Sequence, residues 1–184
     1  MSRLFAAVDI PSSLREKIVD IQKDIGQKNA EIKFVEPQNL HYTIKFLGKV
    51  DPQKLEEIKN ILFAVGENFQ KFTVSVRNLG YFVYGNQIKV LWIGMGEGKD
   101  EFVKVAEVAD KRLSYIREGD FGPSPHLTIG RVEFVKDKEN LVGQLKRFNN
   151  IELGSFVVEE IKLKESVLNR SGPVYKDLGV FKLG

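Results

Sequence analysis

Hydrophobic and polar residues alternate at the start of the segment 41–50, from His41 to Phe46. This alternation predicts a β-strand with His41 and Thr43 on one face and apolar side chains on the other. The pattern recurs after residue 125: residues 126–135 also fit a strand, and this second stretch also begins with a histidine, His126. Both stretches are expected to be strands that bury one face and leave the other open.

Apolar residues spaced three or four positions apart predict four amphipathic helices. The helices are expected at about residues 13–25, 52–65, 99–116 and 137–148. Ser13 followed by Glu16 predicts a capping box, and Asp51 and Asp137 are expected as N-caps of the second and fourth helices. The remaining apolar runs predict further strands. They lie at about residues 3–10, 32–35, 72–79, 87–95, 155–164 and 174–181.

The order of these elements repeats. A strand that begins with histidine, a helix capped by aspartate and a long strand occur twice, and the capping aspartate follows its histidine by 10 and by 11 residues. This predicts a duplicated unit, around residues 41–84 and 126–168, related by an approximate twofold axis. The fold class is expected to be α+β with mainly antiparallel sheets, and residues 1–184 are expected to form one bilobal domain.

Composition narrows the class of protein. The 42% of hydrophobic residues is enough for a real core, and the absence of cysteine excludes disulfides, thiolate metal sites and a cysteine nucleophile. With 28 basic and 25 acidic residues, the surface is densely charged and permits a polyanionic partner without requiring one. We see no signal peptide and no apolar run of about 18 residues, so we expect a cytoplasmic protein without a membrane partner.

The chain contains only two histidines, and both stand in the same setting. His41 opens the sequence His-Tyr-Thr-Ile, and His126 opens His-Leu-Thr-Ile. Chance seldom gives both histidines of a chain the same neighbours. Imidazole also has the side-chain pKa nearest to neutral pH. The matched pair therefore suggests one proton donor and one proton acceptor.

The position of the threonines points to chemistry at phosphorus. Residues two apart on a strand face the same way, so each histidine lies beside its own threonine, Thr43 or Thr128. If the two halves face each other, two imidazoles and two hydroxyls meet in one small volume. One imidazole can then take a proton from an attacking oxygen while the other protonates the leaving oxygen. The hydroxyls can donate hydrogen bonds to the non-bridging phosphate oxygens.

The double His-x-Thr-x pattern resembles the two-histidine phosphoesterase superfamily, and most of all its RNA 2',3'-cyclic phosphodiesterases, also known as 2'-5' RNA ligases. The resemblance covers nearly the whole chain and is carried by residues 3–11, 41–48, 90–94 and 125–131. It implies a bilobal fold in which two antiparallel sheets face a V-shaped cleft, with helices outside. It also implies opening of a 2',3'-cyclic phosphate to a 2'-phosphate without metal or cofactor, with reversible 2'-5' RNA ligation as a weaker activity. The implied partner is RNA with a 2',3'-cyclic phosphate end, tRNA fragments included, and a monomer is expected.

The resemblance also assigns roles to residues. It makes His41 and His126 the acid–base pair, with Thr43, Thr128 and Arg131 as phosphate-binding residues. For hydrolysis we favour His41 as the donor to the leaving 3'-oxygen and His126 as the base, although the two motifs are nearly equivalent. The resemblance also suggests Phe5 as a nucleobase contact, beside a role in the core. No metal ligands are expected.

Two details of the strands qualify these assignments. Strict alternation turns Arg131 away from His126, but the preceding Gly130 is typical of a bulge that would turn Arg131 toward the cleft. Lys45 is expected on the face of His41, where it either attracts phosphate or is solvated. The apolar neighbours of the motif are expected in the core: Tyr42, Phe46, Leu127 and Ile129.

Other interpretations remain open. The glycine-rich residues 94–98 lack the spacing of a P-loop and are interpreted as a strand-to-helix connection. A non-catalytic protein that grips terminal phosphates of RNA would use the same cleft. A phosphodiesterase for a small-molecule cyclic phosphate would share the same histidines.

Overall fold

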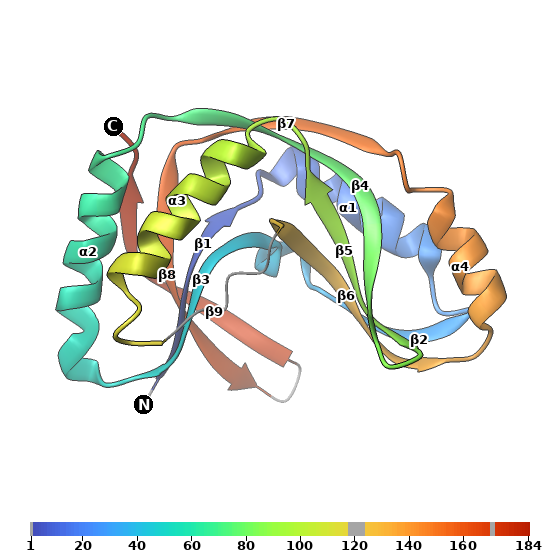
Figure 1. Cartoon of the computed structure of the whole chain (residues 1–184). Coiled ribbons are helices and arrows are strands. Elements are labelled where there is room, and N and C mark those ends of the chain that lie inside the picture. The colour runs from blue at the N-terminus through green and yellow to red at the C-terminus, as the bar shows by residue number, and fades with distance from the viewer. Residues whose placement is uncertain (1, 118–123, 170–171) are drawn as a thin grey trace.

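Two antiparallel β-sheets curve toward each other in the computed structural model of the chain (Figure 1). The structure describes residues 2–117, 124–169 and 172–184. The first sheet has the order β3 (His41–Val50), β1 (Ser2–Asp9), β8 (Glu160–Asn169) and β9 (Gly172–Lys182). The second has the order β2 (Ala30–Phe34), β6 (His126–Val135), β5 (Gln87–Met95), β4 (Phe72–Tyr84) and β7 (Glu152–Val158). The α+β class with antiparallel sheets is confirmed.

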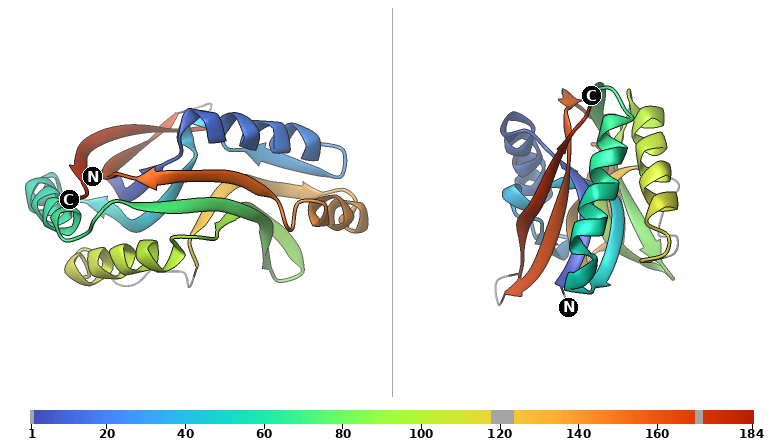
Figure 2. Two further views of the ribbon diagram at one scale, coloured as in Figure 1. Left: turned by 90° about the horizontal axis from the view of Figure 1, so that it is seen from above. Right: turned by 90° about the vertical axis from the view of Figure 1, so that its left-hand side faces the viewer.

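The four predicted helices form on the outside of the sheets. They are α1 (Ser12–Ile25), α2 (Leu55–Glu67), α3 (Lys99–Arg112) and α4 (Lys138–Lys146), with the short 3₁₀ turns η1 (Pro37–Asn39) and η2 (Pro52–Lys54). Seen from above, α1 and α3 lie on opposite sides of the sheets, while α2 and α4 lie at the two ends (Figure 2). One continuous cluster of buried apolar side chains joins helices and both sheets. Residues 96–98 connect β5 to α3, as expected for a strand-to-helix loop.

Two of the three predicted helix caps form. Asp51 accepts a hydrogen bond from the Gln53 amide at 3.0 Å, at the start of η2, and Asp137 accepts one from the Asn140 amide at 3.0 Å. The capping box at Ser13 is wrong, because α1 already begins at Ser12 and has no side-chain cap. Pro11 instead starts this helix, since its fixed φ suits the N-terminus and its carbonyl accepts the first backbone hydrogen bonds.

The single strand predicted at residues 155–164 is two strands in different sheets. The chain leaves β7 in the second sheet and enters β8 in the first sheet one residue later. An apolar pattern shows that a strand is buried but does not show which strand it pairs with. As a result, β8 pairs with β1 and β4 pairs with β5, so each histidine-bearing sheet contains a strand from the other predicted half.

No helix among the described residues is long and apolar enough to cross a membrane.

Candidate active site

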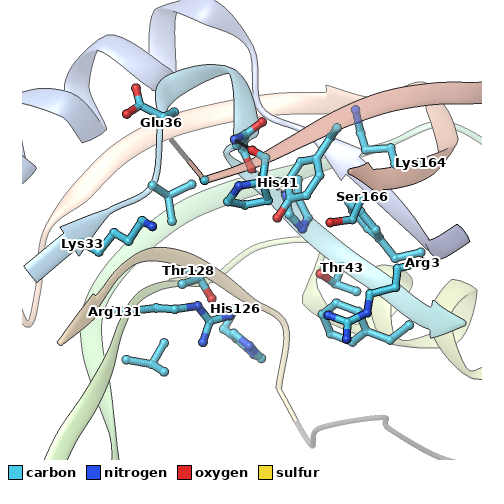
Figure 3. Close-up of a pocket in the computed structure, with 18 of the residues that line it drawn as sticks. Arg3, Lys33, Glu36, His41, Thr43, His126, Thr128, Arg131, Lys164 and Ser166 are labelled. Atoms are coloured by element: carbon cyan, nitrogen blue, oxygen red, sulfur yellow. Dashed lines mark hydrogen bonds between the residues drawn. The ribbon is translucent and has the colours of Figure 1, made fainter. Parts of the chain in front are cut away.

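Both histidines and both threonines of the repeated motif line a single cavity of about 1550 Å³ between the two sheets. His41 and Thr43 come from β3, and His126 and Thr128 come from β6 (Figure 3). Arg131 lines the same cavity. The cavity is larger than the roughly 300–1,000 Å³ of an ordinary small-molecule site, so it has room for more than one nucleotide.

A buried hydrogen bond ties the first histidine strand, β3, to β5, the strand that pairs with the second histidine strand. The Tyr42 hydroxyl, on the far face of β3, donates to the Gly94 carbonyl of β5 at 2.7 Å. Gly94 is the register partner of His126 in the β5–β6 ladder. Tyr42 directly follows His41 in the chain, so one hydrogen bond links the side chain next to the first histidine to the backbone opposite the second. Burial also raises the pKa of the Tyr42 phenol, which keeps it a donor.

The two imidazole rings are oriented by the same device. Nδ1 of His41 donates to the Asn39 carbonyl at 2.7 Å, and Nδ1 of His126 donates to the Ser124 carbonyl at 3.2 Å. A carbonyl can only accept, so the proton of each neutral ring lies on Nδ1. The Nε2 atom of each ring is left to exchange a proton with a ligand.

Aromatic rings pack around His41. The Phe5 ring centroid lies 4.9 Å from it, and the Tyr175 ring meets it edge to face at 5.5 Å. Phe5 is only 4% exposed, so its ring is a support for the imidazole and has little surface left for a nucleobase. Burial lowers the pKa of His41, with the nearby charges of Lys164 and His126 acting in the same direction. The hydrogen bond to the Asn39 carbonyl and the negative charge of Asp9 favour the charged ring and oppose this lowering of the pKa.

Both histidine strands contain a bulge directly after the threonine. In β3, Thr43 pairs with Ala7 but Lys45 pairs with Ala6, so Ile44 has no partner. In β6, Thr128 and Gly130 pair with consecutive residues of β5, so Ile129 has no partner. An extra residue inverts the alternation of faces beyond it. The next residues therefore point opposite to the directions that strict alternation predicts.

The bulge in β3 makes two of the predicted positions wrong. Lys45 does not share the face of His41: its side chain is buried, pairs with Asp110 of α3 and donates to the Arg117 carbonyl at 2.8 Å. Phe46 is not in the core: it is 46% exposed and lines the cavity. Tyr42, Leu127 and Ile129 are buried as expected.

The bulge in β6 places Arg131 on the cavity (Figure 3). The carbonyl of Ile129, the extra residue of the bulge, accepts hydrogen bonds from Gln22 Nε2 and from the Val35 amide, both at 2.9 Å. Gln22 lies on α1 and is 7% exposed. The charge of Arg131 also opposes the rise that burial causes in the pKa of Tyr175.

Several cavity residues were not found from the sequence. Arg3, Lys33, Lys164 and Ser166 come from strands whose pairing the pattern could not give. Lys164 is 5% exposed and is held by Asp9 at 3.1 Å and by Asp177 at 2.6 Å. Within the residues that the structure describes, no three His, Cys, Asp or Glu side chains gather in a way that could hold a metal ion.

Comparison with known proteins finds phosphoesterases that are similar to this chain. The family described as LigT like Phosphoesterase matches residues 8–92. An RNA 2',3'-cyclic phosphodiesterase of Methanothermobacter thermautotrophicus is 36% identical over 98% of this chain and 98% of its own length. One of the same name from Methanocaldococcus jannaschii is 37% identical over 95% of this chain and 96% of its own length.

Solved structures show the same fold. A protein of Thermus thermophilus aligns with a TM-score of 0.82 and 25% identity, covering 98% of this chain and 97% of that one. Escherichia coli LigT in its apo form aligns with a TM-score of 0.77 and 22% identity, covering 99% of this chain and 97% of that one.

Proposed function

This chain belongs to the LigT-like phosphoesterases, the family of the RNA 2',3'-cyclic phosphodiesterases, and we propose that it opens 2',3'-cyclic phosphate ends of RNA to 2'-phosphates. The observation that carries the proposal is that the only two histidines line one cavity from facing strands. Each ring has Nδ1 on a backbone carbonyl and keeps Nε2 for proton transfer. A general acid and a general base are thus present as a pair.

The proposed reaction is an in-line displacement. His126 Nε2 takes a proton from water as the water oxygen attacks phosphorus. The bond from phosphorus to the 3'-oxygen breaks, and protonated His41 gives its Nε2 proton to that oxygen. The products are a 2'-phosphomonoester and a free 3'-hydroxyl, and the two imidazoles return to their starting forms by proton exchange with solvent. Each positioned acid or base is worth roughly 10²–10⁴-fold in rate.

Three side chains donate hydrogen bonds to the charged phosphate in the proposed complex. The hydroxyls of Thr43 and Thr128 lie beside the two histidines, and Arg131 brings a guanidinium to the same cavity. Hydrogen bonds from Arg to phosphate are charge-assisted and can be bidentate. Donors fixed in place before the reaction stabilise the charge that develops in the transition state.

The anion also prepares His41. Burial lowers the pKa of His41 in the free protein, so the neutral ring is favoured. A phosphate anion beside the ring favours the imidazolium and raises its pKa. Substrate binding therefore brings in the proton that His41 later donates.

The same geometry serves ligation. A 5'-hydroxyl of a second RNA in place of water gives a 2'-5' linkage by the identical displacement, and the reverse reaction breaks it. We extend the proposal to tRNA fragments as substrates, to a monomeric enzyme and to turnover without a metal ion.

The test is turnover of adenosine 2',3'-cyclic phosphate and of an oligonucleotide with the same end, with EDTA present. The protein is expected to form the 2'-phosphate. His41→Asn and His126→Asn are each expected to abolish turnover, because asparagine keeps a donor for the backbone carbonyl but has no group in place of Nε2. The double variant should lose no more than either single one, since the two groups act as a unit.

Three results would contradict the proposal. Full turnover by either histidine variant would contradict paired acid–base catalysis. Binding of the cyclic phosphate without turnover would favour a protein that only grips RNA ends. Turnover of the mononucleotide but never of the oligonucleotide would favour a small-molecule substrate.

A further inference from the structure

We propose that Asn39 is a positioning residue for His41: its side chain ties the backbone carbonyl that holds the imidazole to the start of β9. This inference rests on the proposed function, because that function makes His41 the donor of a proton to the leaving oxygen. Asn39 lies outside the repeated His-x-Thr motif and acts only through the imidazole.

Three hydrogen bonds hold Asn39 in place. Its carbonyl accepts from Nδ1 of His41 at 2.7 Å, and its backbone amide donates to the Glu36 carbonyl at 2.8 Å. Its side-chain Nδ2 donates to the Pro173 carbonyl at 2.9 Å. Asn39 is only 8% exposed. A buried residue whose polar groups are hydrogen-bonded has little freedom to turn, so the carbonyl that faces His41 is fixed.

The start of β9 contacts the imidazole by two routes. Pro173 lies 134 residues after Asn39 in the chain and belongs to the first turn of β9, which begins at Gly172. Two residues later, the Tyr175 ring meets the His41 ring edge to face at 5.5 Å between centroids. A distant strand therefore supports His41 through the side chain of Asn39 and through the ring of Tyr175.

The second motif has a weaker form of this support. Ser124 stands two residues before His126, as Asn39 stands two residues before His41. Its carbonyl accepts from Nδ1 of His126 at 3.2 Å in an exposed hydrogen bond, whereas the bond at His41 is shorter and partly buried. Ser124 itself is exposed. The two motifs are thus alike at the histidine and unlike at the residue that holds it.

The stronger support lies at the imidazole that we assign as the proton donor. When imidazolium gives its Nε2 proton to the leaving oxygen, the N–H bond breaks, an O–H bond forms and a neutral ring remains with its proton on Nδ1. The Asn39 carbonyl accepts that remaining hydrogen. It therefore stabilises the tautomer that the donation must produce, and it keeps Nε2 directed at the substrate.

The first test is the steady-state turnover of adenosine 2',3'-cyclic phosphate by Asn39→Leu, which keeps the size of the side chain but removes its N–H donor. The variant is expected to lower kcat by roughly 10- to 100-fold and to leave KM near the wild-type value, because only the orientation of the acid is lost. Asn39→Ala is the second variant, since its small side chain leaves room for water at the Pro173 carbonyl.

Asn29→Leu is the matched control. Asn29 Nδ2 donates to Gln144 Oε1 at 3.0 Å, 115 residues away in the chain. The Asn29 carbonyl also accepts hydrogen bonds, from the Lys136 amide at 2.9 Å and from the Asp137 amide at 3.0 Å. Asn29 is not among the described residues that line the cavity. Its variant is expected to keep the kcat and KM of the wild type.

The second test removes the need for the acid. In a 2',3'-cyclic nucleotide with a bridging 3'-sulfur, the leaving thiolate requires no proton, so the orientation of His41 no longer limits the rate. Asn39→Leu is expected to regain on this substrate the 10- to 100-fold that it loses with oxygen. A residue that only supports the fold would lower turnover of both substrates by the same factor.

The third test observes the ring directly. The ¹⁵N chemical shifts of His41 in the neutral state are expected to place the proton on Nδ1 in the wild type. In Asn39→Leu and Asn39→Ala they are expected to show a mixture with the Nε2 tautomer. His41→Asn identifies the His41 signals by their loss.

The outcomes separate this inference from the proposed function. If the wild type turns over neither the oxygen nor the sulfur substrate, the proposed function is wrong. If the wild type is active and both Asn39 variants lower the two substrates equally, Asn39 is a structural residue and the inference is overturned. Unchanged ¹⁵N shifts of His41 in both variants would overturn it as well.

Discussion

Two residues of the same type at matching positions occupy different surroundings. His41 packs on Phe5 and lies near the ion pairs that hold Lys164, whereas His126 meets the Phe82 ring edge to face at 5.0 Å. The two ladders place Lys164 and Phe82 at comparable positions, each on the third strand counted from its histidine strand. Both imidazoles contact aromatic rings, but the ion-paired Lys164 lies near His41, so the two rings have different electrostatic surroundings.

This difference gives a prediction for the titration of His41. Its pKa in the free protein lies below the ordinary imidazole value, because burial disfavours the charged ring. Adenosine 2'-phosphate, the product of the proposed reaction, is expected to raise that pKa, since an anion favours the imidazolium. Binding then takes up a proton, and affinity is expected to fall as pH rises from the free to the bound pKa.

The measurement is an NMR titration of the two histidine Cε1 protons, with and without adenosine 2'-phosphate. His41→Asn identifies the resonance of His41 by its loss. A His41 pKa that stays unchanged or falls when the nucleotide is added would place the phosphate away from this ring.

At the scale of single elements, the bulges decide which side chains reach the cavity. Directly after Thr43 and Thr128 each strand contains one unpaired residue, so the next side chains point to the opposite face. Gly130 gave a signal for the bulge in β6, so the position of Arg131 could be anticipated from the sequence. The bulge in β3 has Lys45 at the matching position and gives no such signal, which is why Lys45 and Phe46 were placed on the wrong faces.

Gln22 provides a test of how the β6 bulge is maintained. Its amide donates to the carbonyls of Ile129 and Val35, both at 2.9 Å. Gln22→Leu removes both hydrogen bonds from buried or partly buried carbonyls and is expected to lower the free energy of unfolding by about 1–3 kcal/mol. Because the bulge sets the direction of Arg131, the KM for adenosine 2',3'-cyclic phosphate is expected to rise as well.

Gln144→Leu is the matched control for Gln22→Leu. Gln144 Nε2 also donates to two backbone carbonyls, at Asp24 and Ile25, but it lies on α4 and outside the residues that line the cavity. Denaturant unfolding and steady-state kinetics compare the two variants. A Gln22→Leu protein that loses stability but keeps the wild-type KM would show that the bulge holds its shape without Gln22.

At the scale of the whole molecule, each sheet contains strands from both predicted halves of the chain. β4 follows the first histidine motif but pairs with β5, and β8 follows the second motif but pairs with β1. Each sheet that lines the cavity is therefore built from both halves of the chain. The hydrogen bond from the Tyr42 hydroxyl to the Gly94 carbonyl connects the two sheets. The gene duplication that the repeat predicts, like the cytoplasmic location, stays a prediction.

The sequence predicted the helices and strands of this molecule better than it predicted which strands pair with each other. Periodicity located the helices and most strands, and the repeated His-x-Thr motif indicated which residues meet in the cavity. Periodicity could not show that residues 155–164 divide between two sheets, because an apolar pattern does not show which strand a segment pairs with. Arg3, Lys33 and Ser166 were missed for the same reason: they reach the cavity through strand pairings that depend on the assembled sheets.

The central claim is that two imidazoles act on one phosphorus atom, with His41 protonating the leaving oxygen. A 2',3'-cyclic nucleotide with sulfur in place of the bridging 3'-oxygen tests it most directly, because a thiolate leaves without a proton. On this substrate His41→Asn is expected to recover much of the turnover it loses with oxygen, while His126→Asn stays inactive. If neither variant is rescued, acid catalysis by these histidines is contradicted. If only His126→Asn is rescued, His126 is the acid and His41 is the base.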